Sequence, residues 1–215
     1  MIISIDGPAG AGKSTIAGLV AQKLGYIHFN SGLLYRGITA HIITNNLDLE
    51  SIDTDTQLNL SVQFINNQQR VYVNNHDYTS VLRDNNISQL SPIVSMKKII
   101  RNIVDNCQRK FASEHNCVID GRDIGSYVFP NADVKFYLDC DVAERARRRY
   151  KEEIIKNPNI TLNQIQKELI KRDEIDRNKP FARLMVPDNA IIVDSTNLTI
   201  DEVVDKMISI IKQKK

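Results

Sequence analysis

The chain has 215 residues, of which 42% are apolar and 25% are charged, and its formal net charge is +2. This composition is ordinary for a globular protein and argues against intrinsic disorder. The small net charge does not support nucleic-acid binding, so we expect small-molecule partners. There is no signal peptide or apolar run of membrane-spanning length, which predicts a cytoplasmic protein that does not bind membranes. Three scattered cysteines are too few for a disulfide framework or a zinc site.

Several apolar segments predict one parallel α/β sheet. Residues 1–6 form a strand-sized apolar run, and residues 14–24 carry apolar side chains at helical spacing. Three later apolar runs, at 118–120, 134–139 and 190–194, each end at an aspartate and are separated by helix-like segments. Because the carboxyl ends of parallel strands meet at one edge of a sheet, these acids predict a functional edge.

Two stretches interrupt this alternation of predicted strands and helices. Residues 61–78 contain two short β-like segments, "VQFINN" and "QRVYVNN", with asparagine-rich turns, which predicts a small hairpin-bearing insertion. Residues 145–180 are dense in charged side chains and have helical character that breaks near "NPNIT". Taken alone, such a charged segment is typical of a solvated helical face.

The segment "GPAGAGKS" matches the phosphate-loop pattern G-x-x-x-x-G-K-[ST]. Small residues let successive backbone N–H groups converge on phosphate oxygens at a helix N-terminus. Lys13 would reach the β and γ phosphates, and Ser14 would offer its hydroxyl to Mg²⁺. The predicted ATP-binding residues of this loop are Gly7, Pro8, Ala9, Gly10, Ala11, Gly12, Lys13, Ser14 and Thr15.

The phosphate loop alone does not name the reaction. A GTPase would need a guanine-reading N-K-x-D motif after a strand, whereas "NKPF" at residues 178–181 lacks the aspartate and lies in charged helical sequence. A motor or transporter ATPase would normally be larger, although size alone does not exclude a small ATPase module.

Two further motifs could bind an anionic acceptor. "FNSGLLYRG" places Ser31, Tyr35 and Arg36 close together after the first helix, although a lone arginine is more often a surface or ion-pair residue. "DGRDIG" follows a predicted strand, where Asp120 could support the Mg²⁺ shell and Arg122 could bind phosphate as a planar fork. Asp123, in the same motif, could accept hydrogen bonds from an exocyclic amine. A local ion-paired turn is an equal alternative for this segment.

Taken together, these motifs resemble the bacterial cytidylate kinases, which are nucleoside monophosphate kinases of the P-loop class. The resemblance rests on "IDGPAGAGKST", "NSGLLYRG", "DGRDIGSYVFPNADVKFYLD", "RDEIDRNKP" and "VDSTNLTIDEVV", in that order, and covers essentially the whole chain. It implies ATP-dependent phosphorylation of CMP and dCMP. It also implies a P-loop parallel sheet flanked by helices, with a monophosphate-binding insertion and a helical lid.

The resemblance also implies roles for individual residues. Lys13, Arg122 and Arg172 would be catalytic, and Arg148 and Arg149 lie where the lid would approach the ATP phosphates. Arg101 and Asp123 match the pair that reads cytosine, and Asp176 matches the acid that faces the ribose. The full predicted acceptor set is Ser31, Tyr35, Arg36, Arg101, Arg122, Asp123, Arg172, Asp176 and Lys179.

Three positions depart from the family pattern. Asn30 stands where an aspartate is usual, and Lys179 stands where an acceptor-binding arginine is usual. Lysine keeps the charge of arginine but not its bidentate fork. Pro92 occupies the position that usually offers a hydroxyl to cytosine, with Ser91 and Ser95 as substitutes.

We therefore expect a single monomeric kinase domain. Its core would comprise residues 1–36, 93–144 and 181–215, the insertion residues 37–92 and the lid residues 145–180. The expected substrates are ATP, CMP and dCMP, with Mg²⁺ held by Ser14 and supported by Asp120. Two alternatives stay open: a kinase for another small acceptor, such as UMP or a nucleoside, and a nucleotide-binding regulatory module that hydrolyses ATP slowly or not at all.

Overall fold

A computed structural model of the chain describes residues 1–155 and 157–214, and the chain divides into two compact units. The first unit comprises residues 1–28 and 117–215, and the second comprises residues 29–116. Residues 37–92, expected as an insertion, fall within the second unit, and residues 145–180, expected as a lid, fall within the first.

The larger sheet of the protein has five strands in the order β2-β6-β1-β7-β8, and all of them except the second half of β2 belong to the first unit. β1 pairs in parallel with β6 and β7, and β7 pairs in parallel with β8. The predicted parallel α/β sheet is therefore confirmed. The bounds of the strands are β1 (Ile2–Asp6), β2 (Ile27–Asn30), β6 (Cys117–Asp120), β7 (Val134–Asp139) and β8 (Ile191–Asp194).

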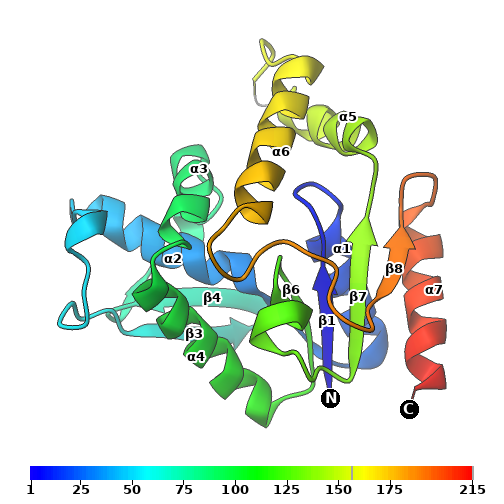
Figure 1. Cartoon of the computed structure of the whole chain (residues 1–215), viewed down its shortest axis with the longest axis horizontal. Coiled ribbons are helices and arrows are strands. Elements are labelled where there is room, and N and C mark those ends of the chain that lie inside the picture. Colours follow the sequence, from blue (N-terminus) through cyan, green and yellow to red (C-terminus); the bar gives the residue numbers. More distant parts are fainter. Residues whose placement is uncertain (156, 215) are drawn as a thin grey trace. The chain divides into compact units, whose positions relative to one another are not determined.

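Helices flank this sheet (Figure 1). α1 begins directly after the phosphate loop and packs against both α7 and β6, which buries one side of the sheet under an apolar layer. α5 and α6 lie beyond the carboxyl end of β7, at the same end of the strands as the loop that follows β1. These helices are α1 (Lys13–Leu24), α5 (Val142–Glu153), α6 (Leu162–Arg177) and α7 (Ile200–Gln213).

The helix ends follow from local sequence. Thr161 and Thr199 each form a capping box, in which the threonine hydroxyl accepts from the N3 backbone N–H and the N3 side chain accepts in return. α1 ends at Leu24 and is capped by Gly25, which has φ 68° and whose backbone N–H donates to carbonyl oxygens of the last helical turn. The break predicted near "NPNIT" is confirmed, because α5 ends at Glu153 and α6 begins at Leu162.

The second unit contains a three-stranded sheet in the order β3-β4-β5, whose strands pair antiparallel. Asn66 and Asn67, at the turn between β3 and β4, have φ of 52° and 61°, a conformation that asparagine tolerates better than most residues. The predicted hairpin is therefore confirmed. The elements of this unit are α2 (Ser31–Thr44), η1 (Leu49–Ser51), β3 (Leu60–Ile65), β4 (Gln68–Val73), β5 (His76–Asp77), η2 (Thr79–Val81), α3 (Asn85–Val94) and α4 (Lys98–Glu114).

No helix in the described part of the chain is long and apolar enough to span a membrane. The three cysteines are free; Cys117 and Cys140 are buried, and Cys107 is partly buried. Burial raises the pKa of the thiols of Cys107 and Cys117 to about 11, so these side chains stay protonated and serve as apolar packing groups.

Candidate phosphate-transfer site

The loop between β1 and α1 has the backbone geometry that a phosphate loop requires. Gly7 has φ 149°, and a Cβ at this position would collide with the carbonyl oxygen of Leu138 on β7. Gly12 has φ 86° and precedes the first residue of α1. Any side chain would be strained at both positions, so glycine is required there. The glycine backbone thus leaves the first N–H groups of α1 next to a loop without bulky side chains, where an anion can bind.

Lys13 lies at the start of α1 and is only 5% exposed. Its Nζ donates a hydrogen bond to the carbonyl oxygen of Pro8 at 2.6 Å. Burial lowers the pKa of Lys13 well below its usual value, and the positive charges of Arg122 and Arg172 lower it further against the opposing effect of nearby carboxylates. Three cationic side chains from α1, the β6 edge and α6 are thus gathered near one loop, as a polyanion site requires.

The aspartates at the ends of β1 and β6 lie within this cationic environment. Asp120, the last residue of β6, is buried, and its Oδ1 lies 2.7 Å from Nε2 of His28. Asp6, the last residue of β1, accepts hydrogen bonds from the backbone N–H groups of Ile124 and Gly125, both at 2.7 Å. The predicted functional edge therefore carries carboxylates that are already held by specific partners.

The Asp6 carboxyl fixes the segment that follows "DGRD". Ile124–Val128 forms a π-helical turn, η3, which directly follows the buried Asp123. Complete burial raises the pKa of Asp6 to about 7, although the two backbone hydrogen bonds and Lys13 act against this shift. Asp123 raises it further as a second nearby negative charge. Single-turn π-helices are rare and are found mostly at functional sites.

Asp176 on α6 is surrounded by two of the predicted acceptor-binding cations. Nε of Arg122 donates to its Oδ2 at 3.0 Å, and Nζ of Lys179 lies 2.7 Å from its Oδ1. Burial tends to raise the pKa of Asp176, but the charges of Arg122 and Lys179 outweigh it and the pKa is lowered. Lys179 is only 6% exposed, so this lysine, which replaces the usual arginine, is buried and fixed by its contact with Asp176.

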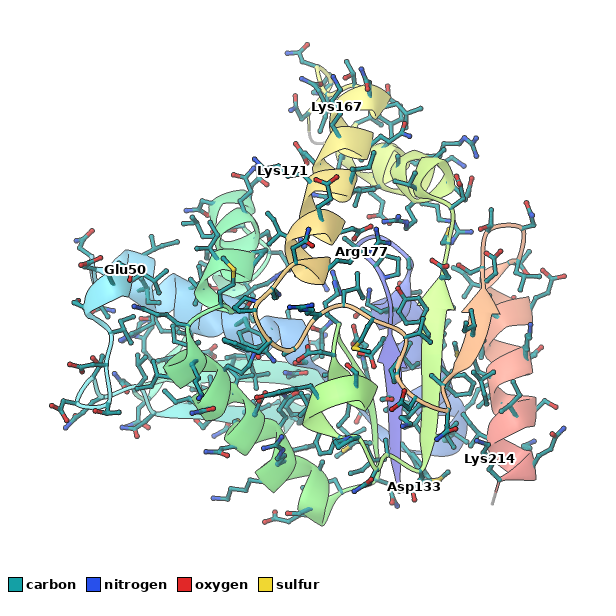
Figure 2. All side chains as sticks on the ribbon, viewed as in Figure 1. Glu50, Asp133, Lys167, Lys171, Arg177 and Lys214 are labelled. Atoms are coloured by element: carbon teal, nitrogen blue, oxygen red, sulfur yellow. The ribbon has the colours of Figure 1, made fainter. Side chains whose placement is uncertain are left out.

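The two candidate lid arginines on α5 are held by protein groups. Arg148 donates from Nε to Glu144 at 3.1 Å and from Nη2 to the carbonyl oxygen of Ser195 at 2.7 Å. Nε of Arg149 lies 3.5 Å from Glu153. Figure 2 shows Lys167 and Lys171 on the outer part of α6, pointing away from the strands, so these lysines belong to the solvated face of that helix.

The predicted acceptor residues of the second unit cluster on α2 and α4. Ser31 and Tyr35 are buried on α2, and Nη1 of Arg36 donates to the carbonyl oxygen of Leu82 at 3.2 Å. The guanidinium of Arg101, which is 2% exposed, lies 5.5 Å from the centre of the Tyr35 ring. This is a cation–π contact that holds the guanidinium over the ring face.

The departures at Asn30 and Pro92 have local structural consequences. Asn30 is the N-cap of α2, and its Oδ1 accepts from the backbone N–H of Leu33 at 3.2 Å, a role in which asparagine and aspartate are equivalent. Pro92 lies within α3. The hydroxyls of Ser91 and Ser95 donate to the carbonyl oxygens of Ile87 and Pro92 at 2.6 and 2.7 Å, so both proposed substitutes already have acceptors inside their own helix.

Sequence reasoning missed three residues that the structure places against the phosphate loop. Arg145 on α5 and Asp173 on α6 form a buried ion pair at 2.7 Å, and both bond to the backbone of Ala9. Asp6 was missed although it follows the rule of strand-end aspartates that singled out Asp120. Asp173 lies in the motif "RDEIDRNKP", but that motif gave it no role, and no sequence signal distinguishes Arg145 from the other charged residues of the segment 145–180.

Comparison with known proteins identifies the family. The cytidylate kinase family model matches residues 3–213. The cytidylate kinase of Halalkalibacterium halodurans is 41% identical over 221 residues, covering 100% of this chain and 98% of the relative. The cytidylate kinase of Geobacter sulfurreducens is 39% identical, covering 100% and 94%, respectively.

Solved structures support the fold alone. The shikimate kinase of Bacteroides thetaiotaomicron superposes with a TM-score of 0.53 at 14% identity, covering 99% of this chain and 98% of that one. A gluconokinase from Sinorhizobium meliloti superposes with a TM-score of 0.51 at 11% identity, covering 99% and 91%. Both are kinases by name.

Proposed function

The chain belongs to the cytidylate kinase family, and on this basis we propose that it transfers the γ-phosphoryl group of ATP to CMP or dCMP, giving ADP and CDP or dCDP in pyrimidine nucleotide metabolism. The observation that carries this proposal is the burial of Lys13 beside the positive charges of Arg122 and Arg172. Such crowding of like charges is unfavourable in the free protein, and a polyphosphate would relieve it.

The mechanism that we propose uses position and charge rather than covalent chemistry. The phosphate loop would hold the β and γ phosphates of ATP, with Lys13 neutralising the charge that develops during transfer. Arg122 and Arg172 would bind the acceptor phosphate and offset the repulsion between two polyanions. No general base is required, because the attacking phosphate oxygen is already anionic near neutral pH.

For the acceptor, we propose that its ribose is bound by Asp176 and its phosphate by Ser31, Arg36, Arg122 and Arg172. Asp123 would accept a hydrogen bond from the 4-amino group of cytosine, and Arg101 would donate to the acceptors of its ring. Tyr35 and Lys179 complete the proposed acceptor set. Closure of the outer parts of α5 and α6, beyond Arg145 and Asp173, would bring Arg148 or Arg149 toward ATP and exclude water from the transferring phosphoryl group.

The donor set fits a magnesium ion that is held mainly by the nucleotide. The described residues contain no group of three or more His, Cys, Asp or Glu side chains that could hold a metal ion. Mg²⁺ seldom needs such a cage and is commonly bound by one or two protein oxygens together with substrate phosphates and water. We propose that the Ser14 hydroxyl binds it and that Asp120 orients its water shell. Held there, Mg²⁺ would neutralise part of the negative charge of the ATP phosphates.

We further propose that the enzyme acts as a cytoplasmic monomer. A stoichiometric assay tests the main proposal: ADP and CDP are measured after mixing the protein with Mg-ATP, with and without CMP. The kinase forms ADP and CDP in equal amounts and forms no ADP when the acceptor is omitted. ADP formation that is independent of CMP, or no turnover at all, would instead favour the nucleotide-binding regulatory module.

A further inference from the structure

Ala9, in the middle of the phosphate loop, is held through both its backbone N–H and its carbonyl oxygen. Oδ1 of Asp173 accepts from the Ala9 N–H at 2.8 Å. Nη1 of Arg145 donates to the Ala9 carbonyl oxygen at 2.8 Å and to Oδ2 of Asp173 at 2.7 Å. The three groups therefore form a closed ring of hydrogen bonds around a single residue of the loop.

The ring is buried and extends to the sheet. Arg145 is 5% exposed and Asp173 is 2% exposed. Nε of Arg145 also donates to the carbonyl oxygen of Cys140, just beyond the end of β7, at 2.9 Å. Water does not compete for these bonds, so the charge-assisted contacts act at nearly full strength.

The position of this ring links the loop to the candidate phosphate-binding arginines. Asp173 is the direct neighbour of Arg172 on α6, and Arg145 lies one helical turn before Arg148 on α5. Apolar contacts follow the same path, because Ala9 packs in a cluster with Ala146, Ile165 and Leu169. One cluster of contacts thus sets the position of the loop and of the helices that carry its proposed charge partners.

We propose that Arg145 and Asp173 are positioning residues that lock the phosphate loop to α5 and α6. The loop N–H groups and the arginines on these helices, Arg148 and Arg172, are thereby placed to bind the same polyphosphate. Neither Arg145 nor Asp173 would touch the nucleotide. The inference rests on the proposed binding of ATP at the phosphate loop but not on the identity of the acceptor.

The simplest alternative is that Arg145 and Asp173 only stabilise the fold as an ion pair. The two roles are separated by comparing Arg145→Met, Asp173→Leu and the double variant Arg145→Met/Asp173→Leu. Removing one member leaves the other charge buried without its partner, whereas removing both leaves no unpaired charge. The double variant is therefore expected to melt at a higher temperature than the weaker of the two single variants.

Binding of Mg-ADP, measured by calorimetry below each melting temperature, gives the decisive readout. We expect the dissociation constant to rise at least about tenfold in the double variant as well as in the single variants, because the Ala9 backbone has lost one partner in each single variant and both partners in the double variant. The KM for ATP should rise in parallel. Affinity that returns to the parent value together with thermal stability would show that the pair is only structural and would overturn the proposal.

Arg145→Lys keeps the test decisive if the apolar variants do not fold. Lysine retains the charge beside Asp173, but its single ammonium does not reproduce the fork that joins Ala9, Asp173 and Cys140. We expect a folded protein with weakened Mg-ADP binding, and parent-like affinity would contradict the proposal. The matched control is Lys23→Met/Asp205→Leu, which removes an exposed ion pair of 2.7 Å between α1 and α7. This control should leave affinity unchanged.

A separate outcome would count against the proposed function. If the parent protein does not bind Mg-ADP, the phosphate loop is not a nucleotide-binding site and the proposed kinase function is wrong. If the parent binds Mg-ADP but does not phosphorylate CMP, only the proposed acceptor is wrong. The comparison of the Arg145 and Asp173 variants then still tests the positioning role.

Discussion

Nζ of Lys179 lies 2.7 Å from Oδ1 of Asp176, and both side chains are almost completely buried. Because Arg122 bonds to the other oxygen of the same carboxylate, one acid holds two of the predicted acceptor-binding cations. Lys179 thereby occupies a defined position, although its single ammonium group lacks the two-pronged hydrogen-bonding geometry of an arginine. Asp176 organises this part of the site through its negative charge, which makes its ionisation a determinant of stability.

Asp176→Asn should destabilise the protein by about 3 kcal/mol near pH 7, because the buried Lys179 and the partly buried Arg122 lose their counter-charge. The pKa of Asp176 is lowered in the folded protein, so its contribution is present above the unfolded value of 3.8 and is lost as the pH falls through the folded pKa. Urea unfolding from pH 7 downward should show the difference between parent and variant shrinking below about pH 4. A difference that grows toward low pH would contradict this prediction.

Asp6 should show the opposite dependence on pH. Its pKa is raised from 3.8 to about 7, so folding favours the protonated carboxyl and the parent loses stability as the pH rises through this interval. Measured against Asp6→Asn, which does not titrate, the relative free energy of unfolding of the parent should fall between pH 4 and pH 7 and level off above. Urea unfolding at four pH values provides the test, and a relative stability that stays constant or rises would refute the assignment.

Lys13→Ala should abolish phosphoryl transfer and leave a folded protein. The lysine would supply the charge that stabilises the transferring group, whereas alanine is well tolerated at the start of a helix. Circular dichroism and thermal melting check the fold, and ADP and CDP formation checks the activity. Lys23→Ala, on the exposed part of α1, is the matched control. Turnover near the parent rate in Lys13→Ala would remove the phosphate loop from the mechanism.

Much of the fold could be predicted because its signals are local. The strand-end aspartates, the glycines of the phosphate loop and the asparagine turns of the hairpin each reflect a short-range constraint on the backbone. Strands β1, β6, β7 and β8 and the β3-β4 hairpin follow these signals, whereas the fifth strand of the sheet, β2, was not predicted.

The ring around Ala9 was not predictable in the same way. Arg145 and Asp173 are separated by 28 positions in the chain and lie in a segment in which many charged residues, such as Lys167 and Lys171, face solvent. Only the packing of α5 against α6 distinguishes the buried pair from these neighbours. The π-helical turn η3 likewise depends on the Asp6 carboxylate, which is 118 positions away from Ile124 in sequence.

The choice of base should depend on Asp123. Cytosine offers a 4-amino donor where uracil offers a carbonyl, so uracil would place its O4 against the carboxylate. Asp123→Asn and Asp123→Ala should therefore lower the ratio of kcat/KM for CMP over UMP, chiefly by impairing CMP, and by about tenfold or more. Steady-state kinetics with both acceptors measure the ratio. A parent that clearly prefers CMP, together with mutants that keep the same ratio, would show that Asp123 does not read the base.

The acceptor profile of the unmodified protein is the most direct test of the proposed phosphoryl transfer from ATP to CMP or dCMP. With Mg-ATP held in excess, kcat/KM is measured for CMP, dCMP, UMP and AMP, and the phosphorylated products are identified together with ADP. A cytidylate kinase forms one ADP for each CDP or dCDP, and its kcat/KM for at least one of the cytosine nucleotides exceeds the values for UMP and AMP. Preferred phosphorylation of UMP or AMP, or release of ADP without a phosphorylated acceptor, would contradict the proposed function.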